Sequence, residues 1–587
     1  MPGKVSLPRL VVRYALLVAL LCLPEKFMLG ASCNVVKHHP PTEADKAFLA
    51  ANYAKAADLY KAGLASHPGD AEMTMGLVHA LLRQQKVQEA ADAVKASLAA
   101  APNSAALITL RGEVELRQGM PWVAGQTAFE SDKLDLCNAR NHLLLADLER
   151  LSSQYATSRK QLGFAHILDP EDPEIRGEWI HTLSLKQRIA EAEAYLSAPR
   201  GDDEEDLRHW RMYLESLKKK ASEPHKVCHL VSPTATTEIP FAVLMRDPMH
   251  IRAFGLEVKL NGRTSRLQID TGAGGLLVSR SVAEHAGLKA FSKTEMAGIG
   301  DKGYTPSYTA YADSIRIGNL EFQDCSVDVL DSRNVLEDVD GLIGMDVFSQ
   351  FLVTLDYPMR KLLLSPLPPR PGETAQAPTL KTSAVDPDES GASEEPAKDA
   401  AQDKPPALGT DSGLKAPAAG SNAPAPAQNA VVKPSPSHGP YDRYIAPEMK
   451  DYTPVYRVGH NLILPAALNG KEIKLFILDT GSFATTISPQ AAREVTKVRS
   501  DDQHHVKGIN GEVKNVYSAD EVTFNFAHLS QKAHDVVAFD TSRISKNVGM
   551  EISGFLGATT LNLLAIHIDY RDGLVKFDYN PNRGYRF

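Results

Sequence analysis

Apolar residues follow three different patterns along the 587-residue chain, and the changes of pattern mark the expected segments. One uninterrupted apolar run, Tyr14 to Leu23, lies near the start. Residues 41–222 then show the spacing of amphipathic helices, whereas residues 235–368 and 446–587 show short alternating runs typical of β-strands. Residues 369–440 contain no Phe, Trp or Tyr and are rich in Pro and Ala, so we expect a disordered linker there. The pattern predicts a multidomain protein, with an all-α region followed by two all-β regions.

The apolar run near the start is too short to cross a bilayer but suits the core of a signal peptide. Small residues follow it and would provide a cleavage site just before Cys33. This arrangement resembles a bacterial lipoprotein signal, although the Leu usual three residues before the cysteine is Gly30 here. We expect residues 1–33 to be a signal peptide and the protein to be exported, to the bacterial periplasm or cell envelope or out of the cell. Two interpretations of Cys33 stay open: lipid attachment, which would anchor the protein to a membrane, or an ordinary thiol left by cleavage.

Residues within 41–222 recur at a spacing of 34. Prolines share one register at Pro68, Pro102 and Pro170, and small residues share another at Ala56, Ala90, Ala124 and Ser158. This period resembles the tetratricopeptide repeat, in which pairs of helices stack and form a concave surface. The resemblance implies a surface that holds a protein partner or feeds substrate to the rest of the chain, and a spacer without a ligand is the alternative. A last helix with Leu207, Trp210, Leu214 and Leu217 on one face is expected to cap the array.

The two strand-rich regions contain the same landmarks in the same order. From the Asp to the last Gly of the apolar segment there are 74 residues in one copy and 78 in the other, and the next Asp follows 12 residues later in both. This repetition predicts an internal duplication. The first copy contains Asp270-Thr271-Gly272, Gly298-Ile299-Gly300, Gly341-Leu342-Ile343-Gly344 and Leu355-Asp356-Tyr357. The second contains Asp479-Thr480-Gly481, Gly508-Ile509-Asn510, Gly554-Phe555-Leu556-Gly557 and Ile568-Asp569-Tyr570.

A duplicated Asp-Thr-Gly has a chemical reason to occur in pairs. Two carboxylates held about 3 Å apart cannot both ionise, so they share one proton. One carboxyl group is then able to act as a base on water while the other donates to a substrate carbonyl. Thr supplies a hydroxyl that can tie the two loops together, and Gly allows their backbones to approach closely.

Each copy resembles one half of a retropepsin-type aspartic peptidase, the related pepsin-like enzymes included. In that family two halves pair, and each gives a catalytic loop, a glycine-containing flap hairpin and an apolar segment behind the loop. The resemblance implies that Asp270 and Asp479 are the catalytic pair. It also implies roles for the remaining motif residues. Those supporting the catalytic loops would be Thr271, Gly272, Thr480, Gly481 and Ser482, and those at the flap tips would be Gly298, Ile299, Gly300, Gly508 and Ile509.

The two catalytic loops differ at one place, where Ser482 corresponds to Ala273. In pepsin-like relatives a hydroxyl here can donate to the outer oxygen of the Asp, and such a bond lowers the pKa of the carboxyl group. We therefore expect Asp479 to be the ionised member and Asp270 the protonated one. Replacing Ser482 by Ala should then shift the acidic limb of the pH–rate profile upward.

Composition and charge exclude several other functions. The formal net charge of −8 disfavours a nucleic-acid-binding surface. The five cysteines show no paired spacing, and His504-His505 is expected to be a solvated loop pair, so we predict neither a metal nor a cofactor. The sequence thus indicates an aspartic endopeptidase acting on protein or peptide substrates, with both halves in one chain. The alternatives are an inactive peptide-binding protein or scaffold built on the helical repeats, and a peptidase that is active only as an intermolecular dimer.

Overall fold

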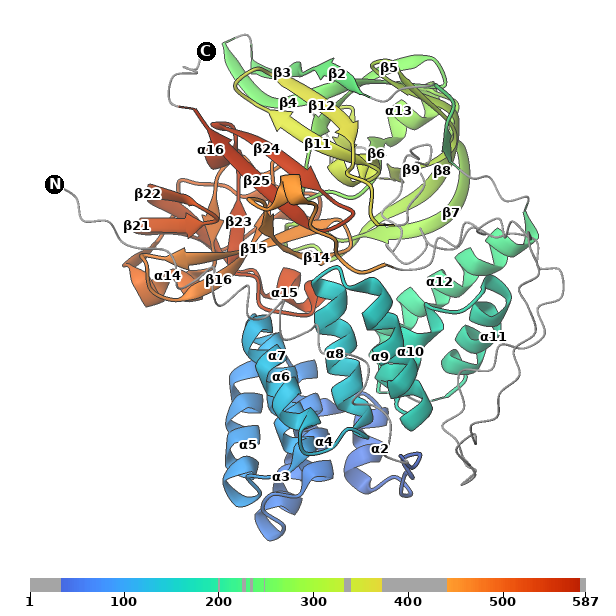
Figure 1. Ribbon diagram of the computed structural model, residues 1–587, viewed down its shortest axis with the longest axis vertical. Coiled ribbons are helices and arrows are strands. Elements are labelled where there is room, and N and C mark those ends of the chain that lie inside the picture. Colours follow the sequence, from blue (N-terminus) through green and yellow to red (C-terminus); the bar gives the residue numbers. More distant parts are fainter. Residues whose placement is uncertain are drawn as a thin grey trace, which may run out of the picture.

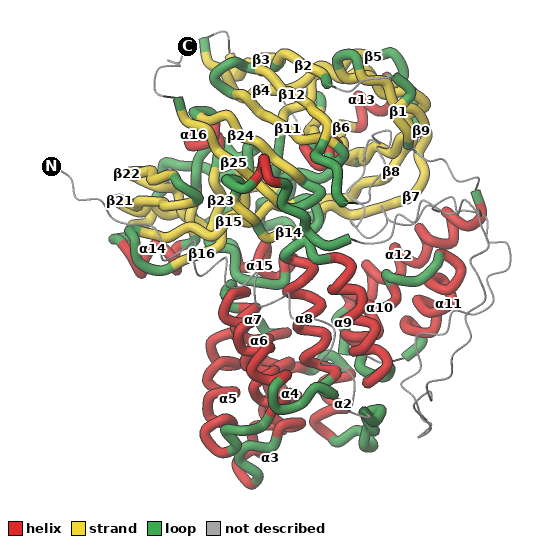
Figure 2. Tube along the Cα trace, in the orientation of Figure 1, coloured by secondary structure: helices red, strands yellow, loops and turns green. Residues whose placement is uncertain are grey.

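The computed structural model describes residues 33–198, 201–223, 228–232, 236–247, 249–331, 339–371 and 441–580. Helices from the first part of the chain form the lower region in Figure 1, and two β halves lie side by side above them. Figure 2 shows the same separation, with helices below and strands above. The predicted fold class, helical repeats followed by two all-β regions, is confirmed. Residues 1–32 of the expected signal peptide and residues 372–440 of the expected linker lie outside the described residues. Cys33 and residues 369–371 belong to the described structure instead, with Cys33 bonded to Cys137 and Arg370 paired with Asp572.

The helical region is built from units of 34 residues, as the sequence predicts. Small side chains are buried between neighbouring helices at Ala56, Ala90, Ala124 and Ser158. Capping side chains accept a hydrogen bond from the first turn of a helix at Asp70, Ser104, Asn138 and Asp172, each 34 residues after the last. A left-handed residue turns the chain between the two helices of a unit at Ala51, Gln85, Gly119 and Ser153. The helices are α2 (Glu43–Leu49), α3 (Tyr53–Ser66), α4 (Ala71–Arg83), α5 (Val87–Ala100), α6 (Ala105–Arg117), α7 (Pro121–Asp132), α8 (Ala139–Leu151), α9 (Tyr155–Leu168), α10 (Pro173–Ile180), α11 (Leu185–Leu196) and α12 (Glu204–Ser222).

The first β half is one twisted sheet of strand order β1-β9-β6-β10-β5-β4-β8-β7, with β3 added beside β4. The short strand β10 runs parallel to β5 and antiparallel to β6, so it lies between the strands on either side of the Asp-Thr-Gly loop. The elements are β1 (His229–Leu230), β3 (Ala242–Asp247), β4 (His250–Leu260), β5 (Arg263–Ile269), β6 (Leu276–Ser279), α13 (Arg280–His285), β7 (Lys289–Met296), β8 (Thr305–Ile317), β9 (Leu320–Leu330) and β10 (Gly341–Ile343).

The second β half repeats these pairings, with strand order β14-β15-β16-β23-β17-β22-β21-β18. Here β23 runs parallel to β16 and antiparallel to β17, as β10 does in the first half. Asn261-Gly262 and Asn469-Gly470 have positive φ angles in both halves, which suits the tight hairpin turns at these places. The elements are β14 (Tyr456–Val458), β15 (Asn461–Leu468), β16 (Ile473–Leu478), β17 (Thr486–Ile487), α14 (Pro489–Val495), β18 (Val498–Ser500), β19 (Lys507–Gly508), β20 (Gly511–Glu512), β21 (Val516–Phe526), β22 (Leu529–Phe539), α15 (Ser542–Val548), β23 (Gly554–Leu556) and α16 (Ala558–Leu561).

A third sheet joins the two halves. Its six strands follow the order β13-β25-β24-β11-β12-β2, and its central pairing is β11 of the first half against β24 of the second. One buried hydrophobic cluster continues through both halves and this sheet. Because backbone hydrogen bonds cross the junction, the two halves form one folded unit. The strands are β2 (Thr237–Pro240), β11 (Phe351–Asp356), β12 (Lys361–Pro366), β13 (Thr453–Pro454), β24 (Leu564–Asp569) and β25 (Leu574–Tyr579).

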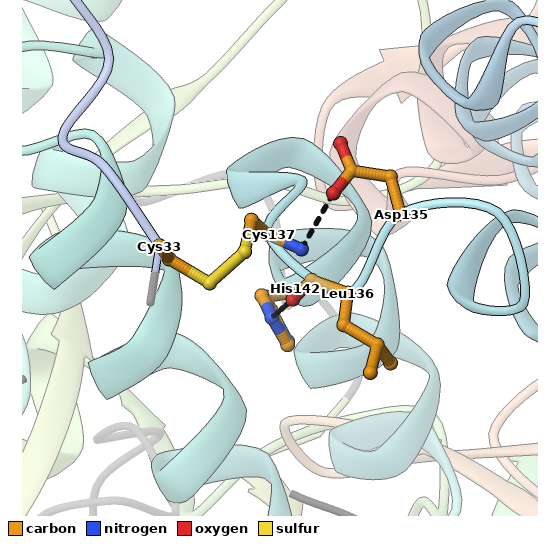
Figure 3. Close-up of a disulfide and its surroundings, with 5 residues drawn as sticks. All are labelled: Cys33, Asp135, Leu136, Cys137 and His142. Atoms are coloured by element: carbon orange, nitrogen blue, oxygen red, sulfur yellow. Dashed lines mark hydrogen bonds between the residues drawn. A yellow bond between two sulfur atoms is a disulfide. The ribbon is translucent and has the colours of Figure 1, made fainter. Parts of the chain in front are cut away.

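Two disulfides fasten segments that are far apart in the chain. Cys33 is bonded to Cys137 (Figure 3), and Cys228 is bonded to Cys325. No spacing in the sequence indicated this pairing, because 104 and 97 residues separate the partners. The interpretation of Cys33 as a lipid-attachment site is wrong for this structure, since a sulfur atom in a disulfide cannot also form the thioether to a lipid. No helix among the described residues is long and apolar enough to cross a membrane.

The helical region contacts the second β half directly. The backbone N–H of Glu551 donates to the carbonyl of Arg117 (3.0 Å), at the end of α6. The hydroxyl and backbone N–H of Thr157 both donate to the carboxylate of Asp442 (2.8 and 3.0 Å). Leu151 of α8 belongs to the same buried hydrophobic cluster as residues of the second half. The repeats are therefore packed against the β halves rather than tethered at a distance.

Candidate active site

Asp270 and Asp479 each follow the strand at the middle of their half. The backbone N–H of Asp270 donates to the carbonyl of Ile343 (3.0 Å), and that of Asp479 donates to Leu556 (3.0 Å). The strand behind each loop therefore fixes the point at which the Asp leaves the sheet. This equivalent anchoring brings the two carboxyl groups together at the junction of the halves.

Thr271 and Thr480 bind the two loops to each other reciprocally. The Thr271 hydroxyl accepts from the backbone N–H of Thr480 (3.0 Å), and the Thr480 hydroxyl accepts from that of Thr271 (3.0 Å). The Thr271 hydroxyl also donates to the Leu478 carbonyl (2.7 Å), and the Thr480 hydroxyl donates to the Ile269 carbonyl (3.4 Å). Both threonines are buried. Each loop therefore holds the other in place.

The glycine after each threonine lies against the aspartate of the opposite half. A Cβ atom at Gly272 would lie 2.8 Å from Cγ of Asp479. A Cβ atom at Gly481 would overlap Cγ of Asp270. The loops approach so closely that only glycine fits at these two positions, which is the geometric reason for the third residue of the triplet.

The two carboxyl groups are largely buried and lie against each other. Burial raises the pKa of Asp270 well above its usual value, and the charge of Asp479 beside it raises this pKa further. Burial also raises the pKa of Asp479. Backbone N–H groups oppose the rise at both carboxyl groups: Gly272 donates to Oδ1 of Asp270 (2.9 Å), and Gly481 and Ser482 donate to Oδ1 of Asp479 (2.9 and 3.0 Å). A buried pair of this kind shares one proton.

The expected role of the Ser482 hydroxyl is wrong. This hydroxyl donates to the carbonyl of Ala484 (3.1 Å), within its own loop, rather than to Asp479. The hydrogen bond from Ser482 to Asp479 comes from the backbone N–H, which any residue except proline provides. The backbone N–H of Ala273 acts on Asp270 in the same way, so the difference between Ser482 and Ala273 does not distinguish the two carboxyl groups.

The two predicted flap tips lie against each other. The backbone N–H of Asn510 donates to the carbonyl of Ile299 (2.9 Å), and the N–H of Lys302 donates to the carbonyl of Asn510 (2.9 Å). A Cβ at Gly508 would overlap the Ile299 carbonyl, and one at Gly298 would lie 3.1 Å from Cβ of Ile509. Gly300 has a φ of +131° and faces the backbone of Asn510. The tips are thus joined by backbone hydrogen bonds in a closed arrangement.

Each flap isoleucine packs into the opposite half. Ile509 of the second half contacts the buried cluster of the first that contains Leu277, Leu330 and Leu342. Ile299 of the first half contacts the cluster of the second that includes Phe555. Each half therefore contributes one flap isoleucine to an apolar cluster of the other half, just as each loop contributes one threonine hydroxyl to the other loop.

Three side chains that support the site were missed in the sequence. His460, in the turn between β14 and β15, donates from Nε2 to the carbonyl of Gly272 (3.0 Å), and burial lowers the pKa of this histidine. Gln268 donates to the carbonyl of Gly481 (3.2 Å). The third residue, Asp346, acts behind the first catalytic loop.

Asp346 connects that loop to a buried cation. Its carboxylate accepts from the backbone N–H of Gly275 (3.0 Å), and its charge acts on the buried Arg457. A comparison of the two copies could not find His460 or Asp346, because Arg252 and Thr559 stand at the corresponding positions. No repeated pattern in the sequence therefore marked them.

The described residues contain no group of three or more His, Cys, Asp or Glu side chains placed to hold a metal ion. The pair His504-His505 is exposed, and its members contact Asp501 and Glu512 separately.

Comparison with known proteins agrees with this architecture. Residues 256–347 and 464–560 match the family model described as aspartyl protease, and residues 47–114 match that of the tetratricopeptide repeat. No curated protein sequence matches the chain. In sequence order, the chain thus contains a tetratricopeptide repeat region followed by two aspartyl protease segments.

Solved structures of three proteins resemble parts of the chain. The aspartic proteinase from Irpex lacteus is 11% identical, with 59% of this chain and 98% of that one covered and a TM-score of 0.31. A thermophilic tetratricopeptide repeat protein from Thermus thermophilus is 19% identical, with coverages of 30% and 95% and a TM-score of 0.24. A retropepsin-like aspartic protease from Rickettsia conorii is 18% identical, with coverages of 24% and 96% and a TM-score of 0.17. At these low scores the three resemblances carry no argument about activity.

Proposed function

We propose that this chain, with its two aspartyl protease segments, is an aspartic endopeptidase whose catalytic pair is Asp270 and Asp479. The observation that carries the proposal is the mutual contact of the two Asp-Thr-Gly loops, each braced by the threonine of the other. A surface turn containing Asp and Gly would need no such reciprocal bonding. The pairing within a single chain supports a monomeric active site.

In this proposal the two carboxyl groups have different tasks. Asp479 acts as the base that takes a proton from the attacking water. Asp270 holds the shared proton and donates it to the carbonyl oxygen of the peptide bond. Water oxygen bonds to the carbonyl carbon, and a tetrahedral diol forms without a covalent acyl-enzyme. Collapse of the diol breaks the C–N bond, as the amine takes a proton and the pair returns to its starting state.

The flaps supply the second requirement of the proposed reaction, which is exclusion of bulk water. Their tips are joined by the bonds between Ile299 and Asn510, so a polypeptide substrate enters only after these bonds open. Closing over the substrate would then bury the reacting bond. In a site without bulk water, the electrostatic interactions of the two carboxyl groups with the reacting peptide bond are stronger than in water.

We also propose that the enzyme works outside the cytosol. The two disulfides support this, because such bonds persist in oxidising compartments such as the periplasm or the extracellular space. Protein or peptide substrates in that compartment are the proposed partners of the cleft.

Cleavage of a denatured protein, with and without a pepstatin-like transition-state mimic, tests the proposed activity. We expect cleavage that the mimic blocks, and loss of cleavage in both Asp270→Asn and Asp479→Asn. Mixing the two variants should restore nothing, because each chain holds both halves of its own site. Activity in either single variant would contradict the proposed pair, and rescue on mixing would indicate that the halves exchange between chains. A wild-type chain that binds the mimic without cleaving would instead be an inactive peptide-binding protein.

A further inference from the structure

Two arginines occupy equivalent positions in successive helical repeats. Arg83 ends α4 and Arg117 ends α6, which is a separation of one 34-residue unit. The stacked repeats therefore bring both guanidinium groups to the same face. Burial lowers the pKa of Arg117, and the nearby charge of Arg83 adds to this effect while that of Glu174 opposes it. Two positive charges held together in this way favour a ligand that brings carboxylates.

Arg117 has little in direct contact to balance its charge. Its guanidinium donates a long hydrogen bond to Oε1 of Gln85 (3.4 Å), and its buried Nε atom has no hydrogen-bond partner among the described residues. No carboxylate of those residues lies within ion-pair distance of it, whereas Arg140 on the next unit is paired with Glu113 and Asp172 (2.9 and 3.2 Å). Arg117 is therefore the less compensated of the two arginines, because Arg83 pairs with Asp202 and Asp206.

The chain places its own acidic segment on this site. Asp206 and Asp202 contact the guanidinium of Arg83 at 2.7 and 3.3 Å. The carbonyl of Gly201 accepts from the hydroxyl of Tyr53 (2.7 Å), which seats the same segment against the first repeat. The segment reads Gly-Asp-Asp-Glu-Glu-Asp from residue 201 to residue 206. We define these residues as the acidic segment.

The helix that begins within the acidic segment also holds the first flap. Arg208 and His209 of α12 contact the carboxylate of Glu295 at 3.0 and 3.4 Å, and Glu295 lies at the end of β7, just before the flap tip. The ring of His209 meets the edge of Tyr304, on the other side of the tip, at 4.6 Å between centroids. Figure 1 shows α12 running from the helical repeats toward β7. One helix thus connects the arginine pair to the flap.

We propose that Arg83 and Arg117 form a docking site for an acidic peptide segment of another protein. The acidic segment of this chain fills the site until the partner displaces it, and displacement loosens the hold of α12 on the first flap. The charge of the internal occupant defines the chemistry of the partner, which must present carboxylates at similar spacing. The binding step stands independently of the proposed peptidase activity, and only the consequence for cleavage rests on it.

Two ion pairs connect the acidic segment to Arg83. The Asp202 side chain is only 9% exposed, whereas Asp206 is 29% exposed. The outer pair, with Asp206, is weak enough for a ligand to replace it first. Removal of both pairs should therefore shift the flap equilibrium by about fivefold to tenfold rather than open it fully. A ligand of the right charge achieves the same shift by competing for Arg83.

The test uses the full chain and a fluorescent peptide of sequence Gly-Asp-Asp-Glu-Glu-Asp, with a peptide of Asn and Gln in place of the acids as the control. The double variant Asp202→Asn/Asp206→Asn should bind the acidic peptide about fivefold to tenfold more tightly than wild type, because the internal competitor is gone. Arg83→Gln and Arg117→Gln should each lose this binding. Equal affinity of wild type and the double variant for the acidic peptide would overturn the proposal, and so would equal binding of the neutral peptide.

Hydrogen exchange at residues 297–304 measures the flap without any need for catalysis. Exchange should speed up by about fivefold to tenfold in the double variant, and in wild type saturated with acidic peptide. Lys218→Gln is the matched control, since Lys218 lies on the same helix and pairs with Glu193 of α11 (2.6 Å), outside the acidic segment. Unchanged flap exchange in the double variant would contradict the connection through α12. Peptide binding and flap exchange should be the same in Asp270→Asn as in wild type, because neither measurement needs cleavage. The docking proposal is thereby tested separately from the peptidase proposal.

Discussion

The two catalytic loops have the same Asp-Thr-Gly triplet, but different residues support them from below. Beneath the first loop lie three ionisable side chains, Asp346, Arg457 and His460, all largely buried. Beneath the second loop the hydroxyl of Thr485 meets that of Thr560 (2.5 Å) and accepts from the backbone N–H of Gly557 (3.1 Å). The first loop therefore has two buried charged groups beneath it, Asp346 and Arg457, whereas the second is held by neutral hydrogen bonds.

The two halves are thus equivalent in shape and unequal in electrostatics. Asp346 and Arg457 bring buried charges close to the first loop. The carboxyl groups themselves have similar surroundings, because backbone N–H groups donate to both, from Gly272 to Asp270 and from Gly481 to Asp479. The difference between the halves therefore lies beneath the loops.

The largest effect is expected where the two loops touch. Gly481→Ala would drive a methyl group into Asp270, and we expect kcat/KM to fall by at least about a hundredfold, since misplacement by an ångström is enough for such a loss. Gly272→Ala should be milder because its neighbour is farther away. Steady-state kinetics on a short peptide measure both. Gly125→Ala in α7, where nothing lies within 4 Å, is the control. Wild-type activity in Gly481→Ala would refute the close approach.

A second experiment compares the charged and neutral supports directly. Asp346→Asn removes the charged acceptor of the Gly275 N–H, whose charge also acts on the buried Arg457, and we expect the free energy of unfolding to fall by about 2 to 3 kcal/mol. Thr485→Val removes neutral hydrogen bonds under the other loop and should cost about 1 to 2 kcal/mol. Urea unfolding followed by circular dichroism checks both values. Equal losses of unfolding free energy would mean that the charged support of the first loop contributes no more to stability than the neutral support of the second.

His460 gives a smaller effect that depends on pH. Burial lowers its pKa in the folded state, so the folded protein favours the neutral ring. The stability that follows is complete above the unfolded pKa of about 6.5 and is lost as the pH falls below it. His460→Gln keeps a donor for the Gly272 carbonyl and cannot titrate, so it should lose less stability than wild type between about pH 7 and pH 5.

The control for that prediction is His460→Ala, which removes both the titration and the donor. It should be less stable than His460→Gln at every pH, by about 1 kcal/mol for one hydrogen bond. Urea midpoints measured from about pH 5 to pH 8 separate the two contributions. A slope with pH that is the same in wild type and in His460→Gln would show that His460 is not the group responsible.

The smallest effect is expected from Ser482→Ala. The hydroxyl lost in this variant contacts the Ala484 carbonyl, and the backbone N–H that reaches Asp479 is kept. The acidic limb of the pH–rate profile should therefore stay where it is in wild type. An upward shift of that limb in Ser482→Ala would contradict this prediction and would indicate that the Ser482 hydroxyl donates to Asp479, as the sequence suggested.

The sequence predicted those parts of the site that both copies share. Asp270, Thr271, Ile299 and their partners were found because each landmark appears twice at similar spacing. His460 and Asp346 appear once, so repetition contained no information about them. The side-chain torsion of Ser482 decides between two acceptors, and the choice depends on a tertiary contact that no local pattern encodes.

In the fold, too, local features were predicted from the sequence and long-range contacts were not. The helical period and the Asn-Gly turns are local signals, and both predict elements that the structure contains. The disulfide partners Cys33 and Cys137, and the contacts of α12 with the first flap, join segments far apart in the chain. Such contacts depend on how the repeats pack against the β halves, which periodicity alone does not specify.

The two ends of the segment between the halves meet at a single residue. Arg370 pairs with the buried carboxylate of Asp572, to which the backbone N–H of Tyr444 also donates (2.8 Å), and the guanidinium of Arg370 lies 3.4 Å from the ring centre of Tyr441. The described residues on either side of the segment therefore contact each other. New termini opened between them would leave the shared sheet intact, so a cut between the halves would not by itself separate them.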